Sequence, residues 1–148
     1  MSLVEMLTVI AVIGVITAIV IVAMTDFRRT ARVTTTAYNL ESFGRGFTAF
    51  YHMNGGTWPR DNHNRLPTGV GLEEYIAVVD FNDTTPVGGR YNWDGPSHHP
   101  FAAISITGST APVEELRQVD EIMDDGNLST GSFRRYRGSY TYVFNENP

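Results

Sequence analysis

Residues 1–24 read MSLVEMLTVIAVIGVITAIVIVAM, and the organisation of the whole chain follows from them. From Met6 to Met24 there is no charged residue. As an α-helix rising about 1.5 Å per residue, this run would cover roughly 28 Å, close to the ~30 Å hydrocarbon core of a bilayer. The sequence therefore predicts an N-terminal helix that is long enough to span a membrane.

One acidic residue, Glu5, lies directly before this apolar run. A carboxylate in hydrocarbon costs on the order of 2.5–3.5 kcal/mol unless it is paired. An ordinary single-pass anchor or an uncleaved signal peptide explains the apolar run but gives no reason for the acid. Glu5 is therefore expected to have a partner.

The segment from Ser2 to Gly14, SLVEMLTVIAVIG, closely resembles the N-terminus of mature type IV pilins and of type II secretion pseudopilins. This resemblance implies a prepilin that is cleaved by a prepilin peptidase, N-methylated at Met1 and polymerised with its hydrophobic helices bundled in a filament core. It also implies that Glu5 pairs with a terminal amine in the assembly. Met1 and Glu5 are thus the predicted assembly residues, with Met1 the predicted processing and N-methylation site.

Two positions depart from the usual family pattern. The first residue is Met1 where the family usually has Phe, so the chain is either the trimmed protein or one that starts at its initiator. The register of Glu5 favours trimming. Many type IV pilins carry a Pro at the position of Val22, and its absence predicts a helix that is continuous or only partly loosened, although Gly14 remains.

Composition limits the remaining function classes. The chain has 148 residues and a formal net charge of -5, which leaves room for one small head and disfavours nucleic acid as the main partner. It has no Cys, so neither a disulfide nor a thiolate metal site is expected. No catalytic constellation is recognisable, and the protein is predicted not to be an enzyme, with no catalytic or cofactor-binding residues.

Three arginines, Arg28, Arg29 and Arg32, follow the apolar run at once. By the positive-inside rule alone they would keep the head in the cytoplasm. The family resemblance implies the opposite course, in which the protein waits in the inner (cytoplasmic) membrane and then enters an extracellular or periplasmic filament. We give the resemblance more weight, because a prepilin leader is itself basic.

The first helix is expected to continue to about His52. Its second half carries an apolar stripe with spacings of three and four, and Asn54-Gly55-Gly56 followed by Pro59 should end it. Gly44 and Gly46 weaken this half unless something packs closely there. The predicted division is residues 1–25 for the transmembrane or filament-core helix, 26–53 for its amphipathic half, and 54–148 for a globular head.

The head is predicted to contain a loop over residues 57–71, a short helix over 72–81, a hairpin of strands at 89–93 and 101–107, a helix opening at Pro112 and a final strand at 140–144. The inner face of the helix after Pro112 should be Leu116, Val119, Ile122 and Met123. The resulting fold class is α+β, with a long N-terminal helix packed against a small antiparallel sheet. The segments Gly56-Thr57-Trp58-Pro59 and Pro86–Trp93 resemble those of pseudopilin-like heads.

Two histidine groups are candidate metal ligands, and His63 is also a candidate base. His98 and His99 are adjacent, so their side chains diverge on an extended chain, and His63 lies near Asp61 in an Asn-rich turn. Solvated loops are the favoured interpretation of both.

A run of acids closes the helix that opens at Pro112. Acids in the last turn oppose the helix dipole, so a cation should compensate them. The alternatives are pairing with Arg134, Arg135 or Arg137, simple solvation, or a calcium ion held by hard oxygen ligands. The calcium candidates are Asp120, Asp124, Asp125 and the carbonyl of Asn127.

The leading hypothesis is a structural subunit of a type IV pilus or pseudopilus, which forms a helical homo-oligomer with the help of a prepilin peptidase and an assembly machinery. Major pilin, minor pilin and pseudopilin are not separated, nor are adhesion, motility, DNA uptake and secretion. The alternative is a membrane-anchored binding module or enzyme that uses the helix as a tether. In that case residues 58–65 and 97–101 would supply its ligand contacts.

Overall fold

The computed structural model describes residues 2–148, so the roles predicted for Met1 lie outside the described residues. The structure divides into two compact units, residues 1–32 and residues 33–148. Helix α1 (Leu3–Met53) contributes to both, and it is helical through Gly14 and Val22. The first unit consists of the N-terminal part of α1. The second contains the rest of α1 and the head.

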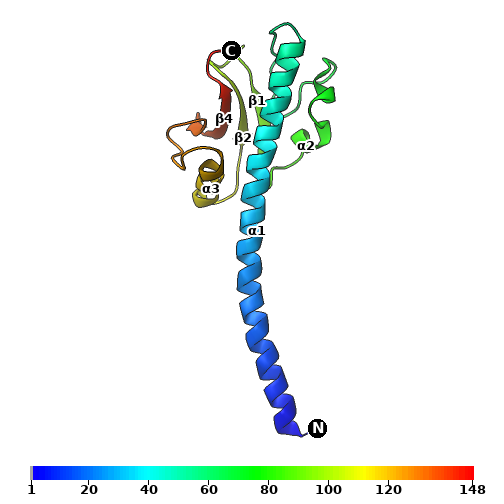
Figure 1. The fold of residues 1–148 in the computed structure, drawn as a ribbon, viewed down its shortest axis with the longest axis vertical. Helices are drawn as coiled ribbons and strands as arrows, with labels where there is room; N and C mark the ends of the chain where they lie inside the picture. Colours follow the sequence, from blue (N-terminus) through cyan, green and yellow to red (C-terminus); the bar gives the residue numbers. More distant parts are fainter. Residues whose placement is uncertain (1) are drawn as a thin grey trace. The chain divides into compact units, whose positions relative to one another are not determined.

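The head adds three short helices and four strands to α1 (Figure 1). The predicted α+β class, with a long N-terminal helix and a small antiparallel sheet, is confirmed. In chain order the elements after α1 are η1 (Leu72–Glu74), α2 (Val78–Asn82), β1 (Arg90–Asp94), β2 (Ala102–Thr107), α3 (Val113–Met123), β3 (Phe133–Tyr136) and β4 (Ser139–Asn145).

The four strands form one antiparallel sheet in the order β1-β2-β4-β3. Trp93 of β1 is opposite Ile104 of β2, which is opposite Tyr142 of β4. Because side chains alternate across a strand, these three residues share one face of the sheet. That face belongs to the main core, together with the apolar stripe of α1 and the inner residues of α3.

Aromatic contacts join α1 to this face of the sheet. Phe47 stacks on Trp93 with ring centroids 4.1 Å apart, and Phe43 meets Tyr91 edge-on at 5.1 Å. The glycines of α1 allow the close approach: a Cβ on Gly46 would lie 2.4 Å from Cγ1 of Ile76. Side chains of the head therefore pack closely against these glycines, as expected for glycines inside a stable helix.

The opposite face of the sheet carries a buried polar row. Asn92, Ser105 and Thr141 are cross-strand neighbours on β1, β2 and β4, and all three are buried. A small apolar cluster on this side contains Phe101, Ala103 and Val143, with Tyr136 packed against it. The loop that follows α1 covers part of the polar row, as described below.

Helix α1 ends at Met53, directly before the predicted stop signal Asn54-Gly55-Gly56. The amide of Asn54 donates to the carbonyl of Phe50, and Gly55 and Gly56 then take positive φ angles of 64° and 76°. Glycine accepts this left-handed conformation without steric cost.

Three details of the head differ from the expectations. The single helix expected over residues 72–81 is two short ones, because Ala77 is extended. In α3, Leu116 and Val119 are buried as predicted, but the prediction for Ile122 was wrong, since it is 52% exposed. Strand β3 was not predicted; of its four residues only Phe133 is buried.

Candidate functional site

The start of α1 is a reciprocal cap formed by Ser2 and Glu5. The Ser2 backbone N–H donates to Oε2 of Glu5 at 2.6 Å, and the Glu5 N–H donates to Oγ of Ser2 at 3.3 Å. This is the capping-box arrangement, in which two otherwise unsatisfied donors at a helix start are satisfied together. Its sequence signal, Ser-x-x-Glu before an apolar run, is present in the chain but was not used in the prediction.

Beyond the cap, the threonines of the apolar run and Thr25, which follows it, are satisfied within the helix. The hydroxyls of Thr8, Thr17 and Thr25 donate to carbonyls one turn earlier, at 2.7–3.0 Å for the i−4 acceptors. A hydroxyl that bonds its own helix needs no partner from the surroundings. This part of α1 can therefore enter an apolar environment without leaving these hydroxyl donors unsatisfied.

The residues Leu3–Met24, here called the apolar segment, have no cover within the described chain. Their large hydrophobic side chains are between 49% (Met24) and 75% (Leu3) exposed. By length and composition, α1 is able to cross a membrane. An apolar surface of this extent marks a contact with lipid or with another protein.

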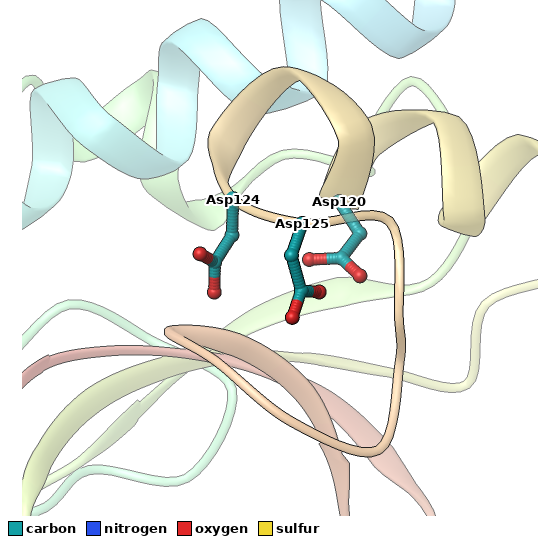
Figure 2. A group of neighbouring side chains, drawn as sticks. All are labelled: Asp120, Asp124 and Asp125. Atoms are coloured by element: carbon teal, nitrogen blue, oxygen red, sulfur yellow. The ribbon is translucent and has the colours of Figure 1, made fainter.

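A second candidate site lies where α3 ends. Figure 2 shows the carboxylates of Asp120, Asp124 and Asp125 on the same side of the helix end, with the loop to β3 curving around them. One oxygen from each of the three residues can be chosen so that all lie within 4.8 Å of one another. The structure thus brings together three of the four predicted calcium candidates.

Asp120 is the buried member of this group. It is 0% exposed, and neither carboxylate oxygen has a hydrogen-bond partner. Burial, followed by the charges of Asp125, Asp124 and Glu121, raises the pKa of Asp120 to about 6. At neutral pH the group therefore carries a charge in a place that disfavours one.

The other two acids also hold the loop. Asp124 accepts a short hydrogen bond from the Ser132 amide, and Asp125 accepts from the Asn127 amide at 2.7 Å and from Oγ1 of Thr130 at 3.0 Å. The carbonyl of Asn127, predicted as a fourth ligand, accepts from the Thr130 amide at 2.9 Å. Asn127 thus forms part of a hydrogen-bonded turn in this loop.

Two of the three arginines expected beside these acids, Arg134 and Arg137, have other side-chain contacts. Arg134 forms a two-pronged ion pair with Glu146, at 2.8 and 3.2 Å, and this pair raises the pKa of Arg134 and lowers that of Glu146. Arg137 lies over the ring of Tyr136, 5.2 Å from its centroid. The expectation that Arg134 folds back onto the acids of α3 was therefore wrong, because its guanidinium is paired with the Glu146 carboxylate.

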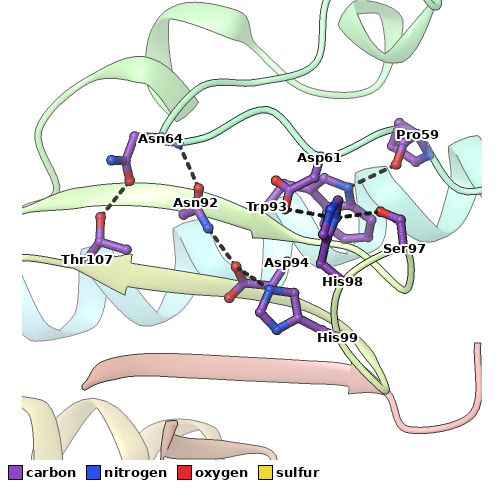
Figure 3. A network of polar contacts seen from close by, with 10 residues as sticks. All are labelled: Pro59, Asp61, Asn64, Asn92, Trp93, Asp94, Ser97, His98, His99 and Thr107. Carbon is purple, nitrogen blue, oxygen red and sulfur yellow. Dashed lines mark hydrogen bonds and ion pairs between the residues drawn. The ribbon is translucent and has the colours of Figure 1, made fainter. Parts of the chain in front are cut away.

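The polar face of the sheet holds a separate network, drawn in Figure 3. The Asn64 amide donates to Oδ1 of Asn92 at 2.7 Å, and Oδ1 of Asn64 accepts from Thr107 at 2.6 Å. From the core face of the sheet, the indole N–H of Trp93 donates to the Pro59 carbonyl at 3.1 Å. These bonds fix the loop after α1 to the sheet, so a structural role accounts for them.

The two adjacent histidines diverge within this network (Figure 3). His98 is exposed and lies 3.9 Å from Asp61, whereas His99 is mostly buried with Nε2 3.6 Å from Oδ1 of Asp94. Burial raises the pKa of Asp94, opposed by hydrogen bonds and by His99. A pocket of about 240 Å³ lies here, with His63 and Tyr136 on its wall. The two histidines do not converge on a shared site.

A larger open groove of about 710 Å³ lies where the loop leaves α1. Phe50, Trp58 and Arg60 are among its lining residues. The indole nitrogen of Trp58 is buried without a hydrogen-bond partner, while the ring stacks on Tyr51 at 4.3 Å. The groove includes part of the loop proposed for ligand contacts in the tethered-module alternative.

Comparisons of the chain with models of protein families, with curated proteins and with solved structures give no match. Its function must therefore be argued from the geometry of its own residues.

Proposed function

We propose that this protein is a structural subunit of a helical filament of the type IV pilus or pseudopilus kind, which it joins through the apolar segment. The observation that carries the proposal is that this segment is exposed along its whole length while its polar groups are already satisfied. Such a helix requires an apolar environment, first a membrane and then a bundle of the same helices from other copies.

The capping box gives the Glu5 carboxylate a local donor, in a simple membrane anchor and in a filament subunit alike. It keeps the Glu5 carboxylate at the start of the helix with a local donor, so the charge has a partner before any second subunit arrives. In a filament the same carboxylate would accept from a terminal amine. Two unit charges about 4 Å apart attract by about 4 kcal/mol at an effective dielectric of 20, before desolvation. That is large enough to favour one axial register of neighbouring helices.

The head is consistent with this role. A small antiparallel sheet packs on the second half of the helix whose first half is apolar, which is the arrangement that the family resemblance implies. The inner membrane before assembly, a prepilin peptidase and an assembly machinery belong to the same proposal. Pilus and pseudopilus are not distinguished by these observations.

Cysteine cross-linking tests the proposal directly, because the chain has no Cys of its own. In the native cell, Ile10→Cys places a thiol on the apolar segment and Asp83→Cys places one on an exposed turn of the head. If the helices are bundled, oxidation of material sheared from the cells should give dimers with Ile10→Cys and far fewer with Asp83→Cys.

Glu5→Ala supplies the second arm of this test. The variant should still enter the membrane, because removing a carboxylate lowers the cost of insertion, but it should be depleted from the sheared fraction. Normal amounts of filament from Glu5→Ala would contradict the role of the carboxylate. A wild-type protein found only as monomer in the membrane would contradict the whole proposal.

A membrane-tethered ligand-binding module is the second candidate, and the groove beside Trp58 is the observation that favours it. In that case Ile10→Cys would stay monomeric and Glu5→Ala would have no phenotype. Substitutions in the groove, and not in the apolar segment, would then impair function.

A further inference from the structure

We propose that Arg28, Arg29 and Arg32 bind the phosphate groups of anionic phospholipids at the point where α1 leaves the membrane. These arginines follow the apolar segment, and the proposed function gives them no role. The inference rests on that function in one respect only, namely that the apolar segment lies in a membrane before assembly. It does not require a filament, so it applies equally to a membrane-tethered module.

The length of the apolar segment sets the depth of the arginines. Helix α1 continues without interruption past Met24. If the hydrocarbon core ends near Met24, Arg28 lies about 6 Å and Arg32 about 12 Å beyond it along the helix axis. The headgroup region on each side of the core is roughly 5–7 Å thick. Arg28 and Arg29 are therefore at the level of the lipid phosphates.

The direction of the helix turns these side chains toward the bilayer. In an α-helix every Cα–Cβ bond is tilted toward the N-terminus. Since the N-terminal part of α1 is the part in the membrane, side chains just beyond it lean toward the headgroups. A long arginine side chain can also bend back to place its charge among polar groups. Arg32, one turn after Arg28, can reach the headgroup region in this way.

The three arginines share one side of α1. With 3.6 residues per turn, Arg28, Arg29 and Arg32 fall within an arc of roughly 100°. Arg28 and Arg32 are exposed, and Arg29 is half-buried. Asp26, the nearest acid in the sequence, lies almost opposite Arg28 on the helix. Like charges on one helix side repel each other, so an anion shared between these arginines would lower the cost of their proximity.

The guanidinium groups of Arg28 and Arg29 are available to such an anion. Neither residue forms an ion pair within residues 2–148. By contrast, Arg45 and Arg134 pair with carboxylates at 3.4 and 2.8 Å. A guanidinium presents a planar fork of donors that matches the oxygens of a phosphate group.

Charge selects an anion, and position selects a lipid as its source. Phe27, directly before the arginines, is 71% exposed. An aromatic ring beside basic residues suits the boundary between hydrocarbon and headgroups. This contact would also give the arginines a role outside the cytoplasm, although the positive-inside rule alone would keep the head inside.

The test uses the full chain reconstituted in phosphatidylcholine vesicles with a trace of spin-labelled phosphatidylglycerol or spin-labelled phosphatidylcholine. Electron paramagnetic resonance measures the fraction of each labelled lipid that is slowed by contact with the protein. One arginine near a membrane surface favours anionic lipid roughly five-fold, so the wild type should show a several-fold preference for phosphatidylglycerol. The preference should decrease in about 1 M salt, where the Debye length is about 3 Å.

The double variant Arg28→Gln/Arg29→Gln should lose most of this preference. Glutamine is a good helix former, so α1 should remain intact. Arg28→Gln alone should lose part of the preference, and it serves as a second variant in case the double variant does not reconstitute. Arg45→Gln is the matched control, since it removes an exposed arginine of α1 that lies in the second unit. It should retain the full preference.

Equal contact of the two labelled lipids with the wild type would overturn the assignment. So would a preference that persists in Arg28→Gln/Arg29→Gln, or one that is lost in Arg45→Gln. The vesicles contain no assembly machinery, so this result is separate from the cross-linking of Ile10→Cys in cells. Cross-linked filaments without a lipid preference would reject this inference alone, whereas a lipid preference without cross-linking would reject only the filament.

Discussion

The indole of Trp93 lies flat on the ring of Phe47, with centroids 4.1 Å apart and 9° between the ring planes. Both side chains are completely buried. The same indole donates its N–H to Pro59, so one residue connects α1, the sheet and the loop after the helix. The contact between Phe47 and Trp93 is therefore the centre of the head's packing.

Phe47→Ala should destabilise the head by about 3–5 kcal/mol, because it removes a buried ring and leaves a cavity against Trp93. The measurement is denaturant unfolding in detergent micelles, followed by the near-ultraviolet circular dichroism of the tryptophans. Tyr38→Ala is the control, since Tyr38 lies on the same helix but is 65% exposed. Equal losses for the two variants would show that the stacked pair does not dominate the packing.

Gly46→Ala should destabilise the head by roughly 1–3 kcal/mol, even though Ala is the better helix former. The added methyl would lie 2.4 Å from Ile76 and 3.0 Å from the carbonyl oxygen of Tyr75, which cannot rotate away. Gly14→Ala is the matched control, because nothing lies within 4 Å of a Cβ at that position. We expect head unfolding to be unchanged by Gly14→Ala; a stabilised Gly46→Ala variant would contradict the close contact.

The pH dependence of stability should carry the signature of Asp120 when divalent ions are removed. Its pKa is raised from 3.8 to about 6 in the folded state, so the folded protein binds the proton more tightly than the unfolded chain does. This group's contribution is therefore most favourable at low pH and declines as pH rises through the window between these values. Stability relative to Asp120→Asn should thus decrease between about pH 4 and pH 7.

The comparison of wild type with Asp120→Asn isolates this group from the pair of Arg134 and Glu146, whose lowered Glu146 pKa acts in the opposite direction. Melting temperatures of both proteins in chelator, across that range, provide the measurement. Asp120→Asn should be the more stable protein at neutral pH, with the difference closing on acidification. A constant difference across the range would show that Asp120 titrates normally.

Local chemistry made much of the fold predictable. Spacing of apolar residues, with Asn54-Gly55-Gly56 as a stop, located α1, and alternation located β1, β2 and β4. Strand β3 was not predicted because it is a four-residue edge strand in which two central arginines interrupt the apolar pattern. Ile122 was wrongly predicted to be buried. Helical spacing shows which side of α3 is apolar, but it does not show how much of that side the rest of the head covers.

The candidate site was only partly predictable for a similar reason. Sequence spacing placed Asp120, Asp124 and Asp125 near one another, but the burial of Asp120 depends on the packing of α3 against distant strands. The partner of Arg134 is 12 residues away in the chain, at a position that only strand pairing brings close. The capping box of Ser2 and Glu5, by contrast, was readable from four consecutive residues.

If the chain assembles as we propose, the hydrogen bond between the Ser2 amide and Glu5 has a consequence for the kinetics of assembly. A carboxylate that accepts from its own helix start can exchange that donor for a neighbour's amine without passing through an unpartnered state. In the proposed filament this intramolecular bond would be replaced by the bond to the neighbour's amine, so the last step of assembly would be an exchange of hydrogen-bond partners. Subunit addition would be reversible until the neighbouring amine arrives, so wrongly placed subunits could leave before they are locked in.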